Sequence, residues 1–250
     1  IKVGTAREYM GERLAHEYLQ HHQIHNGTII APIPDSGNQA ALGMYRFLLG
    51  KGYDVVFEPY LIFRSHASNI RRAFILPQKK DRIERIYEKF QVDEAKTRGK
   101  HILLVDDTLV EGLSSRIVIE MVRSMGAKEV SLGIASPPLL YPDLYGNNMY
   151  ERYITDELIA RRLCGNVTMI AQSINADHLS YLPLDRGIDS ILEARKHTRE
   201  KCERSLPSEQ AQLEELDRTS FHTATYTGEY AVGTGDFPVE GKRPNTAIPR

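Results

Sequence analysis

The stretch Ile102-Leu103-Leu104-Val105-Asp106-Asp107 is a continuous apolar run that ends in two carboxylates. Four consecutive apolar residues are typical of a strand buried on both faces, as in a parallel sheet with helices on each side. A loop over residues 108–113 follows, and Ser114 and Ser115 begin an expected helix. We therefore expect the two carboxylates to lie at the carboxyl end of a buried strand, beside the amino terminus of a helix.

Strand and helix patterns alternate on both sides of this stretch. Further strands are predicted over residues 28–33, 54–57 and 130–135, and helices over 5–20, from Asp35-Ser36-Gly37 to about 49, and from 114 to Gly126. Such alternation predicts an α/β fold with an open, mostly parallel sheet flanked by helices, whose ligands bind at the carboxyl ends of the strands.

The remaining segments are less regular. The charged segment between residues 64 and 98 is expected to begin as a mobile surface loop and to contain a helix over 81–90. Later helices are expected over 156–163 and 184–195, followed by a charge-rich helix over 196–218 and a frayed tail over 232–250. We therefore expect one domain over residues 1–195 and a C-terminal helix and tail over 196–250.

Composition excludes several classes of protein. Lys and Arg total 32 against 33 for Asp and Glu, so the net charge of -1 offers no basic surface for nucleic acid. The apolar runs are much shorter than the roughly 18 residues of a membrane span. Cys164 and Cys202 are too far apart in sequence for a zinc ribbon, and they are too few for a disulfide scaffold. A reducing compartment, the cytoplasm, fits best.

Two further features of the sequence are interpreted without a functional role. His21, His22 and His25 lie close together at the end of a predicted helix, without carboxylate or thiol partners, and we interpret them as a solvated surface rather than a metal site. The first residue is Ile1, and no targeting segment follows it, so the chain is expected to be a fragment or a processed product.

The carboxylates and the following helix suit a phosphorylated, metal-bound sugar. Loop amides and the hydroxyls of Ser114 and Ser115 can hold a phosphate at the positive end of a helix dipole. Asp106 and Asp107 can hold ribose hydroxyls or a divalent cation. The same residues could equally serve only as loop and helix caps. No GxxxxGK[ST] motif is present, so the chain is not a P-loop protein.

The stretch over residues 102–115 resembles the phosphoribosyl-pyrophosphate (PRPP) loop of the type I phosphoribosyltransferases, in particular that of the amidophosphoribosyltransferases of purine synthesis. Other segments resemble that family in order and spacing: residues 6–15, 34–37, 40–43, 72–77, 126–130, 135–138, 145–146, 157–160, 176–184 and 221–230. The likeness spans about residues 6–195 and 221–230, so it is far more specific than the loop alone.

The resemblance implies a type I phosphoribosyltransferase fold with a helical C-terminal extension. It also implies an enzyme that converts PRPP and ammonia derived from glutamine into 5-phosphoribosylamine and pyrophosphate, the first step of purine synthesis. The implied catalytic residues are Asp106, Asp107 and Arg72, the last in a loop that closes over PRPP. The two aspartates would hold the ribose hydroxyls and, with Ser36, Mg²⁺. The other implied substrate-binding residues are Asp35, Ser36, Gly37, Thr108, Gly112, Ser114 and Ser115.

Three departures from the family are visible. The glutaminase domain has no counterpart, so ammonia would come from an upstream domain or partner. Family members usually carry Arg and Thr at the positions of Glu111 and Leu113, and the change is expected to weaken phosphate binding by about one or two orders of magnitude. The expected closing loop, residues 64–71, lacks the tyrosine of the family's Lys-Asn-Arg-Tyr run.

Partners and alternatives follow from the same resemblance. The family's iron–sulfur cysteines are missing, so no such cluster is expected, and a homo-oligomer is expected. Two other functions fit the residues: a diverged, non-catalytic PRPP- or nucleotide-binding regulatory module, and a type I phosphoribosyltransferase with a different acceptor.

Overall fold

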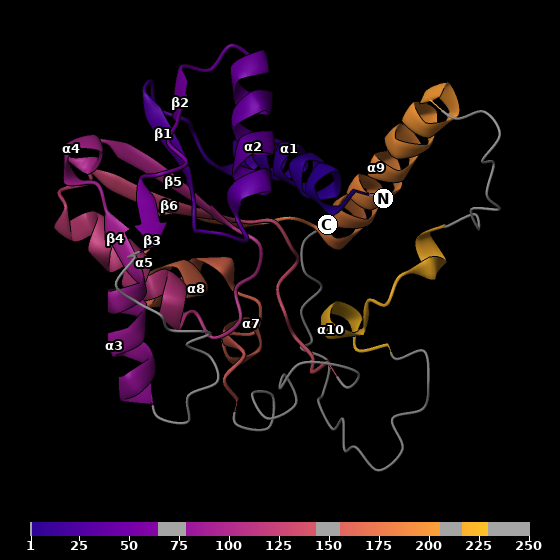
Figure 1. Cartoon of the computed structure of the whole chain (residues 1–250). Coiled ribbons are helices and arrows are strands. Elements are labelled where there is room, and N and C mark those ends of the chain that lie inside the picture. The colour runs from indigo at the N-terminus through magenta and orange to yellow at the C-terminus, as the bar shows by residue number, and fades with distance from the viewer. Residues whose placement is uncertain (1, 65–78, 144–155, 206–216, 230–250) are drawn as a thin grey trace.

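A computed structural model describes residues 2–64, 79–143, 156–205 and 217–229, in which helices and strands alternate (Figure 1). The strands are β1 (Thr28–Pro32), β2 (Val55–Phe57), β3 (Ile62–Arg64), β4 (Phe90–Val92), β5 (His101–Asp106), β6 (Glu129–Ile134) and β7 (Leu179–Tyr181). The longer helices are α1 (Val3–His21), α2 (Asn38–Gly50), α3 (Lys79–Lys89), α5 (Leu113–Ser124), α8 (Val167–Ser173) and α9 (Leu184–Ser205). Shorter helices are α4 (Glu94–Thr97), α7 (Ile159–Arg162), η2 (Arg218–Ser220) and α10 (Ala224–Thr227).

The described residues form a five-stranded parallel sheet with the order β2-β1-β5-β6-β7. The predicted open, mostly parallel sheet flanked by helices is therefore confirmed. The chain runs from β1 outward to β2 and then returns to β5 on the other side of β1. Ligands of such sheets generally bind at a reversal of this kind, in the crevice outside the carboxyl ends of the two strands, which here are β1 and β5. We call this side of the sheet the carboxyl edge and the opposite side the amino edge.

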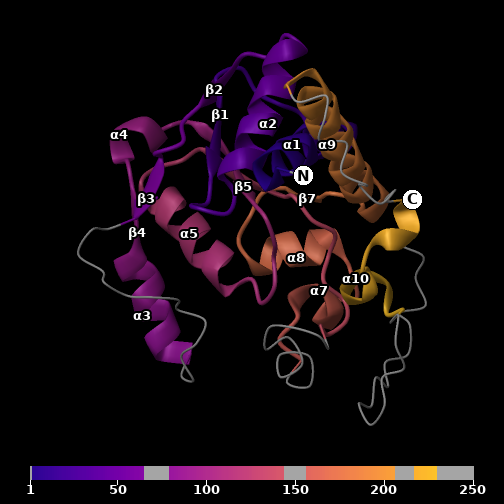
Figure 2. The ribbon, with the colours of Figure 1, turned by 45° about the vertical axis from the view of Figure 1, so that its right-hand side comes forward.

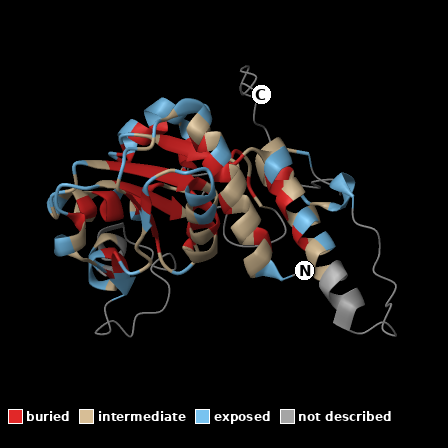
Figure 3. Cartoon of the chain, turned by 90° about the horizontal axis from the view of Figure 1, so that it is seen from above, coloured by how far each residue is buried: buried red, intermediate tan, exposed pale blue. Residues whose placement is uncertain are grey.

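Strand β5 is buried on both faces, as its apolar run predicts. Ile102 and Leu104 belong to the apolar cluster that includes the inner face of α5, whereas Leu103 and Val105 pack with residues of α1 and α2. Figure 2 shows α1 and α2 on one side of the sheet and α5 and α8 on the other, and Figure 3 shows the buried strands between them. Because side chains alternate along a strand, a four-residue apolar run fills both layers of the core.

Helices α1 and α2 approach each other so closely that their backbones touch. A Cβ atom added at Gly11 would lie 1.9 Å from the carbonyl oxygen of Ala40, and one added at Gly43 would lie 1.9 Å from that of Glu8. Real Cβ atoms essentially never come within 3.0 Å of another heavy atom in this way. The crossing therefore depends on two glycines that face the partner helix from opposite sides.

The charged segment before β5 contains more regular structure than expected. Residues 65–78, which include its first part, lie outside the described residues. The helix predicted over 81–90 is present as α3, but β4 then pairs with β3 in an antiparallel two-stranded sheet, and α4 follows. The short strands were missed because neither three-residue run alternates long enough to give a strand period.

The later helices differ from their predicted bounds. The helix expected over 156–163 is the single turn α7. The expected helices over 184–195 and 196–218 are parts of one helix, α9, as far as Ser205, and residues 206–216 lie outside the described residues. Helix α9 packs against α1, where Arg13 and Glu193 form an ion pair of 2.6 Å. A domain boundary at residue 195 would fall inside α9, and the division of the chain stays a prediction. The expected tail, residues 232–250, lies outside the described residues.

None of the helices in the described part of the chain is both long and apolar enough to cross a membrane.

Candidate functional site

The loops that follow β1 and β5 meet at the carboxyl edge, as the strand order requires. The backbone N–H of Ile33 donates to the carbonyl of Val105 at 2.8 Å. A Cβ atom at Gly37 would lie 2.2 Å from that same carbonyl oxygen, so the loop over residues 33–37 packs directly on the end of β5. The Pro34–Asp35 peptide bond within this loop is cis. The arrangement brings Ser36 to Asp106, whose Oδ1 accepts a hydrogen bond from the Ser36 hydroxyl at 3.1 Å.

Asp106 lies in a strongly perturbed environment. Its Oδ1 also accepts a hydrogen bond from the backbone N–H of Asp107 at 2.8 Å. Burial and, second to it, the negative charge of Asp107 raise the pKa of Asp106 to about 8, although the two hydrogen bonds act in the opposite direction. A carboxyl group with so raised a pKa in a crevice is characteristic of a functional site. A cation placed here would stabilise the ionised form.

Asp107 faces a different set of partners. The Thr108 hydroxyl donates to its Oδ1 at 3.3 Å, and the Arg7 guanidinium of α1 lies 3.9 Å from its Oδ2. About a third of the Asp107 side chain is exposed, which leaves room for a ligand. Arg7 is a residue of the site that local sequence patterns do not indicate, although it falls in the resembling segment 6–15.

The loop after Asp107 ends at the amino terminus of α5. Gly112 is the N-cap and has a left-handed backbone with φ of 82°, a conformation that favours glycine. A Cβ atom there would also lie 2.7 Å from Cδ1 of Ile159 in α7, so the loop is wedged between α5 and α7. Since glycine has no side chain to cap the helix, the first-turn amides and exposed Ser114 are available to an anion. Ser115 is buried.

Basic groups surround the carboxylates. Arg64 of β3 forms an ion pair of 2.6 Å with the exposed Asp35. Lys89 of α3 lies near the same carboxylates. Burial and the charge of Arg64 lower the pKa of Lys89, and the negative charges of Asp35 and Asp106 partly oppose this change. Sequence spacing could not indicate Lys89, because it is distant in sequence from Asp35 and Asp106 and only the folded arrangement of α3 places it near them.

A late segment of the chain also reaches the site. Burial raises the pKa of Tyr226 in α10, and the negative charge of Asp107 contributes to this rise. The backbone N–H groups of Leu140 and Tyr141 both donate to the carbonyl of Thr225 at 3.0 Å, which ties this segment to the loop after β6. The resembling segment 221–230 was the signal for this placement, but no role had been assigned to it.

The structure thus gathers Asp35, Ser36, Gly37, Asp106, Asp107, Thr108, Gly112, Ser114 and Ser115 at one edge of the sheet. Arg72 lies outside the described residues. The candidate site combines two carboxylates of unlike environment, hydroxyl groups, a helix amino terminus and flanking cations. Such a set can hold a polyol, a divalent cation and a phosphate together.

Comparisons with known proteins point in one direction. The chain is similar to the amidophosphoribosyltransferases of Haemophilus influenzae (32% identity over 93% of this chain and 40% of the relative) and Escherichia coli (34% over 76% and 35%). It is also similar to that of Archaeoglobus fulgidus (34% over 78% and 38%). The chain spans about two fifths of the length of these relatives. No protein-family model matches it.

Solved structures give the same result for the fold. The glutamine PRPP amidotransferase from B. subtilis, complexed with ADP and GMP, superposes with a TM-score of 0.65 and 26% identity over 92% of this chain and 43% of that one. A structure described as the allosteric regulatory enzyme of purine biosynthesis superposes with a TM-score of 0.63 and 24% identity, over 92% and 42%. The expected type I phosphoribosyltransferase fold is confirmed.

Proposed function

The chain belongs to the amidophosphoribosyltransferase family, of whose members it matches about two fifths of the length, and on this basis we propose that it carries their transferase reaction. In that reaction ammonia displaces pyrophosphate from C1 of PRPP and gives 5-phosphoribosylamine. The proposal places the reaction in the first step of purine synthesis.

One observation carries the proposal beyond similarity. Asp106 and Asp107 lie at the crevice between β1 and β5, and the amino terminus of α5 follows within one short loop. A phosphorylated ribose needs both features, since its vicinal hydroxyls suit paired carboxylates and its phosphate suits helix amides. The raised pKa of Asp106, about 8 because of its burial, supports the proposal, since a bound cation or hydroxyl donor would stabilise its carboxylate.

The residues of this chain would act by binding and orienting. Asp106 and Asp107 would accept hydrogen bonds from the ribose hydroxyls, and Thr108, Ser114 and the first-turn amides of α5 would hold the 5-phosphate. Fixing the sugar at both ends orients C1 for attack by ammonia from the face opposite the pyrophosphate. Ammonia brings its own lone pair and loses a proton to solvent, so no side-chain nucleophile is required.

The same residues suit Mg²⁺. Ser36, Asp106 and Asp107 offer only oxygen donors, which are the ligands that Mg²⁺ prefers. When bound, the ion would neutralise negative charge on the leaving pyrophosphate.

We extend the proposal to ammonia supplied by a glutaminase domain or partner, to closure of a loop that contains Arg72, to a cytoplasmic location and to a homo-oligomer. No role is proposed for an iron–sulfur cluster.

The transferase proposal is tested by pyrophosphate release. Purified protein is incubated with PRPP and Mg²⁺ at mildly alkaline pH, with and without a high concentration of ammonium salt. We expect release that depends on both ammonium and Mg²⁺, because free ammonia can react at the transferase site without the help of a glutaminase. Replacing the ammonium salt with a potassium salt of equal ionic strength controls for screening.

Each other outcome identifies a different function. Binding of PRPP without pyrophosphate release, in protein with a native circular dichroism spectrum, would contradict the transferase proposal and indicate a regulatory binding module. Release that requires a nucleobase rather than ammonium would indicate a different acceptor.

Reversing the charge of Glu111 is expected to tighten PRPP binding. Glu111 lines a small hollow beside Gly112, together with Arg116 and Arg162. Glu111→Arg would remove a negative charge near the expected phosphate position, so we expect PRPP to bind about three- to tenfold more tightly in a calorimetric titration. Glu94→Arg, on α4 near the amino edge, is the matched charge reversal and should leave binding unchanged. Weaker binding by Glu111→Arg would show that Glu111 instead positions the loop.

A further inference from the structure

A second cluster of polar side chains lies at the amino edge of the sheet, away from the carboxylates. His25 precedes β1, His101 is the first residue of β5, and Glu129 is the first residue of β6. His101 and Glu129 are directly paired in the parallel register, and β1 is the neighbour of β5 on its other side. The expectation that these histidines have no carboxylate partner is therefore wrong for His25, and also for His21, which lies 3.5 Å from Glu17. Glu129 is distant in sequence, and only the strand order brings it near.

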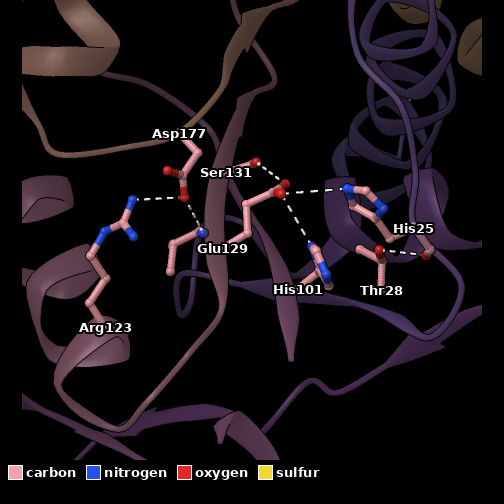
Figure 4. Close-up of polar contacts among 8 residues, drawn as sticks. His25, Thr28, His101, Arg123, Glu129, Ser131 and Asp177 are labelled. Atoms are coloured by element: carbon pink, nitrogen blue, oxygen red, sulfur yellow. Dashed lines mark hydrogen bonds and ion pairs between the residues drawn. The ribbon is translucent and has the colours of Figure 1, made fainter. Parts of the chain in front are cut away.

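The two imidazoles converge on one carboxylate oxygen (Figure 4). Oε2 of Glu129 lies 3.2 Å from Nδ1 of His101 and 3.5 Å from Nε2 of His25. Two ligands of a tetrahedral Zn²⁺, each about 2.0–2.2 Å from the metal, lie about 3.3–3.5 Å from each other. The ligand atoms of the three side chains all lie within 4.8 Å of one another, so one ion can reach all of them after small rotations.

The two imidazole rings lie close together beside the Glu129 carboxylate. The rings of His25 and His101 are only 4.0 Å apart between centroids and are tilted by 37°. One divalent metal ion could therefore bind a nitrogen of each ring and an oxygen of the carboxylate at once.

Neighbouring groups hold the three side chains in place. The backbone N–H and the hydroxyl of Thr28 both donate to the carbonyl of His25, at 3.1 and 2.7 Å, which fixes the loop before β1. The Ser131 hydroxyl donates to Oε1 of Glu129 at 3.4 Å and leaves Oε2 to the imidazoles. Asp177 accepts from the N–H of Val130 at 2.7 Å and so anchors the start of β6 (Figure 4). Such supporting contacts orient metal ligands.

We propose that His25, His101 and Glu129 form a binding site for Zn²⁺ or a chemically similar divalent transition metal. About half of the His25 side chain is exposed, whereas His101 and Glu129 are mostly covered, so the fourth coordination position opens to solvent on the side of His25. The ion would tie the amino ends of β1, β5 and β6 together and stabilise the folded state. Two nitrogen donors distinguish this site from the all-oxygen site at the carboxyl edge.

The test is metal binding by untagged protein, stripped with a chelator and then exchanged into buffer with excess Mg²⁺. Excess Mg²⁺ occupies oxygen sites but does not compete for imidazole. We expect one Zn²⁺ per chain by calorimetry, an increase in the melting temperature, and Co²⁺ absorption bands of the intensity typical of four-coordinate sites.

Variants decide whether these residues hold the ion. His101→Gln and Glu129→Gln are expected to weaken Zn²⁺ binding at least about tenfold. His25→Gln should weaken Zn²⁺ binding to the same extent. Because His25 is exposed in a loop, this variant should stay folded, and it keeps the test informative if the other two variants unfold. His16→Gln is the matched control, because His16 is exposed on α1 and contacts Gln20 instead. Zn²⁺ binding that Mg²⁺ abolishes, or that His25→Gln leaves unchanged in folded protein, would overturn the proposal.

Discussion

Asp106→Asn is expected to lower PRPP affinity by about a hundredfold or more while making the metal-free protein more stable at pH 8. The loss of affinity follows from the proposed role of Asp106, since its ionised carboxylate would hold ribose hydroxyls and the cation. Asn keeps an oxygen that can accept from Ser36 and from the backbone N–H of Asp107. The variant should therefore fold normally and lose only the charge.

The stability gain follows from the direction of the pKa shift. Burial raises the pKa of Asp106 in the folded protein to about 8 from the usual 3.8. Between these two values the folded state binds more protons than the unfolded state, so wild-type stability falls as the pH rises. A shift of one pKa unit corresponds to about 1.4 kcal/mol of stability. Because Asp106 is partly exposed and interacts with the charge of Asp107, only part of its shift contributes to stability, and we expect Asp106→Asn to gain about 1–2 kcal/mol at pH 8.

Urea unfolding in the presence of a chelator, at pH 5 and pH 8, measures this effect. The difference in free energy of unfolding between Asp106→Asn and wild type should be larger at pH 8. Asp107→Asn is the matched variant: it should also lose PRPP affinity, and it should lower the pKa of Asp106 by removing a neighbouring charge. A stability difference that is equal at both pH values would show that Asp106 is ionised throughout this range.

Gly11→Ala and Gly43→Ala are each expected to destabilise the protein by about 2–3 kcal/mol, or roughly 5–10 °C in melting temperature. Each new methyl group would lie 1.9 Å from a carbonyl oxygen of the facing helix, so α1 and α2 would have to separate. The better helix propensity of alanine recovers less than about 1 kcal/mol of this cost.

Gly4→Ala is the matched control on the same helix. Its Cβ would meet only the side chain of Gln39, at 3.7 Å, so stability should stay the same or rise slightly. Separation of the helices would also move Arg7 of α1 away from Asp107, so PRPP affinity should fall in the two destabilised variants even where they are folded. Equal melting temperatures for Gly4→Ala and Gly11→Ala would show that the crossing can relax at little cost.

The local sequence pattern was sufficient to predict features that lie within a single strand and the loop after it. The apolar run of β5 predicted a strand buried on both faces, and the carboxylates after it were correctly expected at the carboxyl edge. The family resemblance predicted Ser36 at the same site, and its hydroxyl does contact Asp106. The roles of these residues in binding substrate are still predictions.

Features that depend on strand order could not be read from the sequence. Lys89 reaches the site from α3, and Glu129 reaches His25 across two neighbouring strands. Local spacing carries no information about either contact, because each joins residues that are distant in the chain. The three-residue strands β3, β4 and β7 are held by their sheet partners rather than by a pattern of their own.

The position of β1 between β2 and β5 has a consequence for how the chain folds. The register pairs Ile29 with Ile102, so the central pairing of the sheet must wait for the closure of a very long loop. Parallel pairings of this kind form slowly, and during synthesis β1 emerges long before its central neighbour. Until β5 leaves the ribosome, the apolar residues of β1 have no inner partner strand. A chain truncated before residue 101 should therefore aggregate rather than fold.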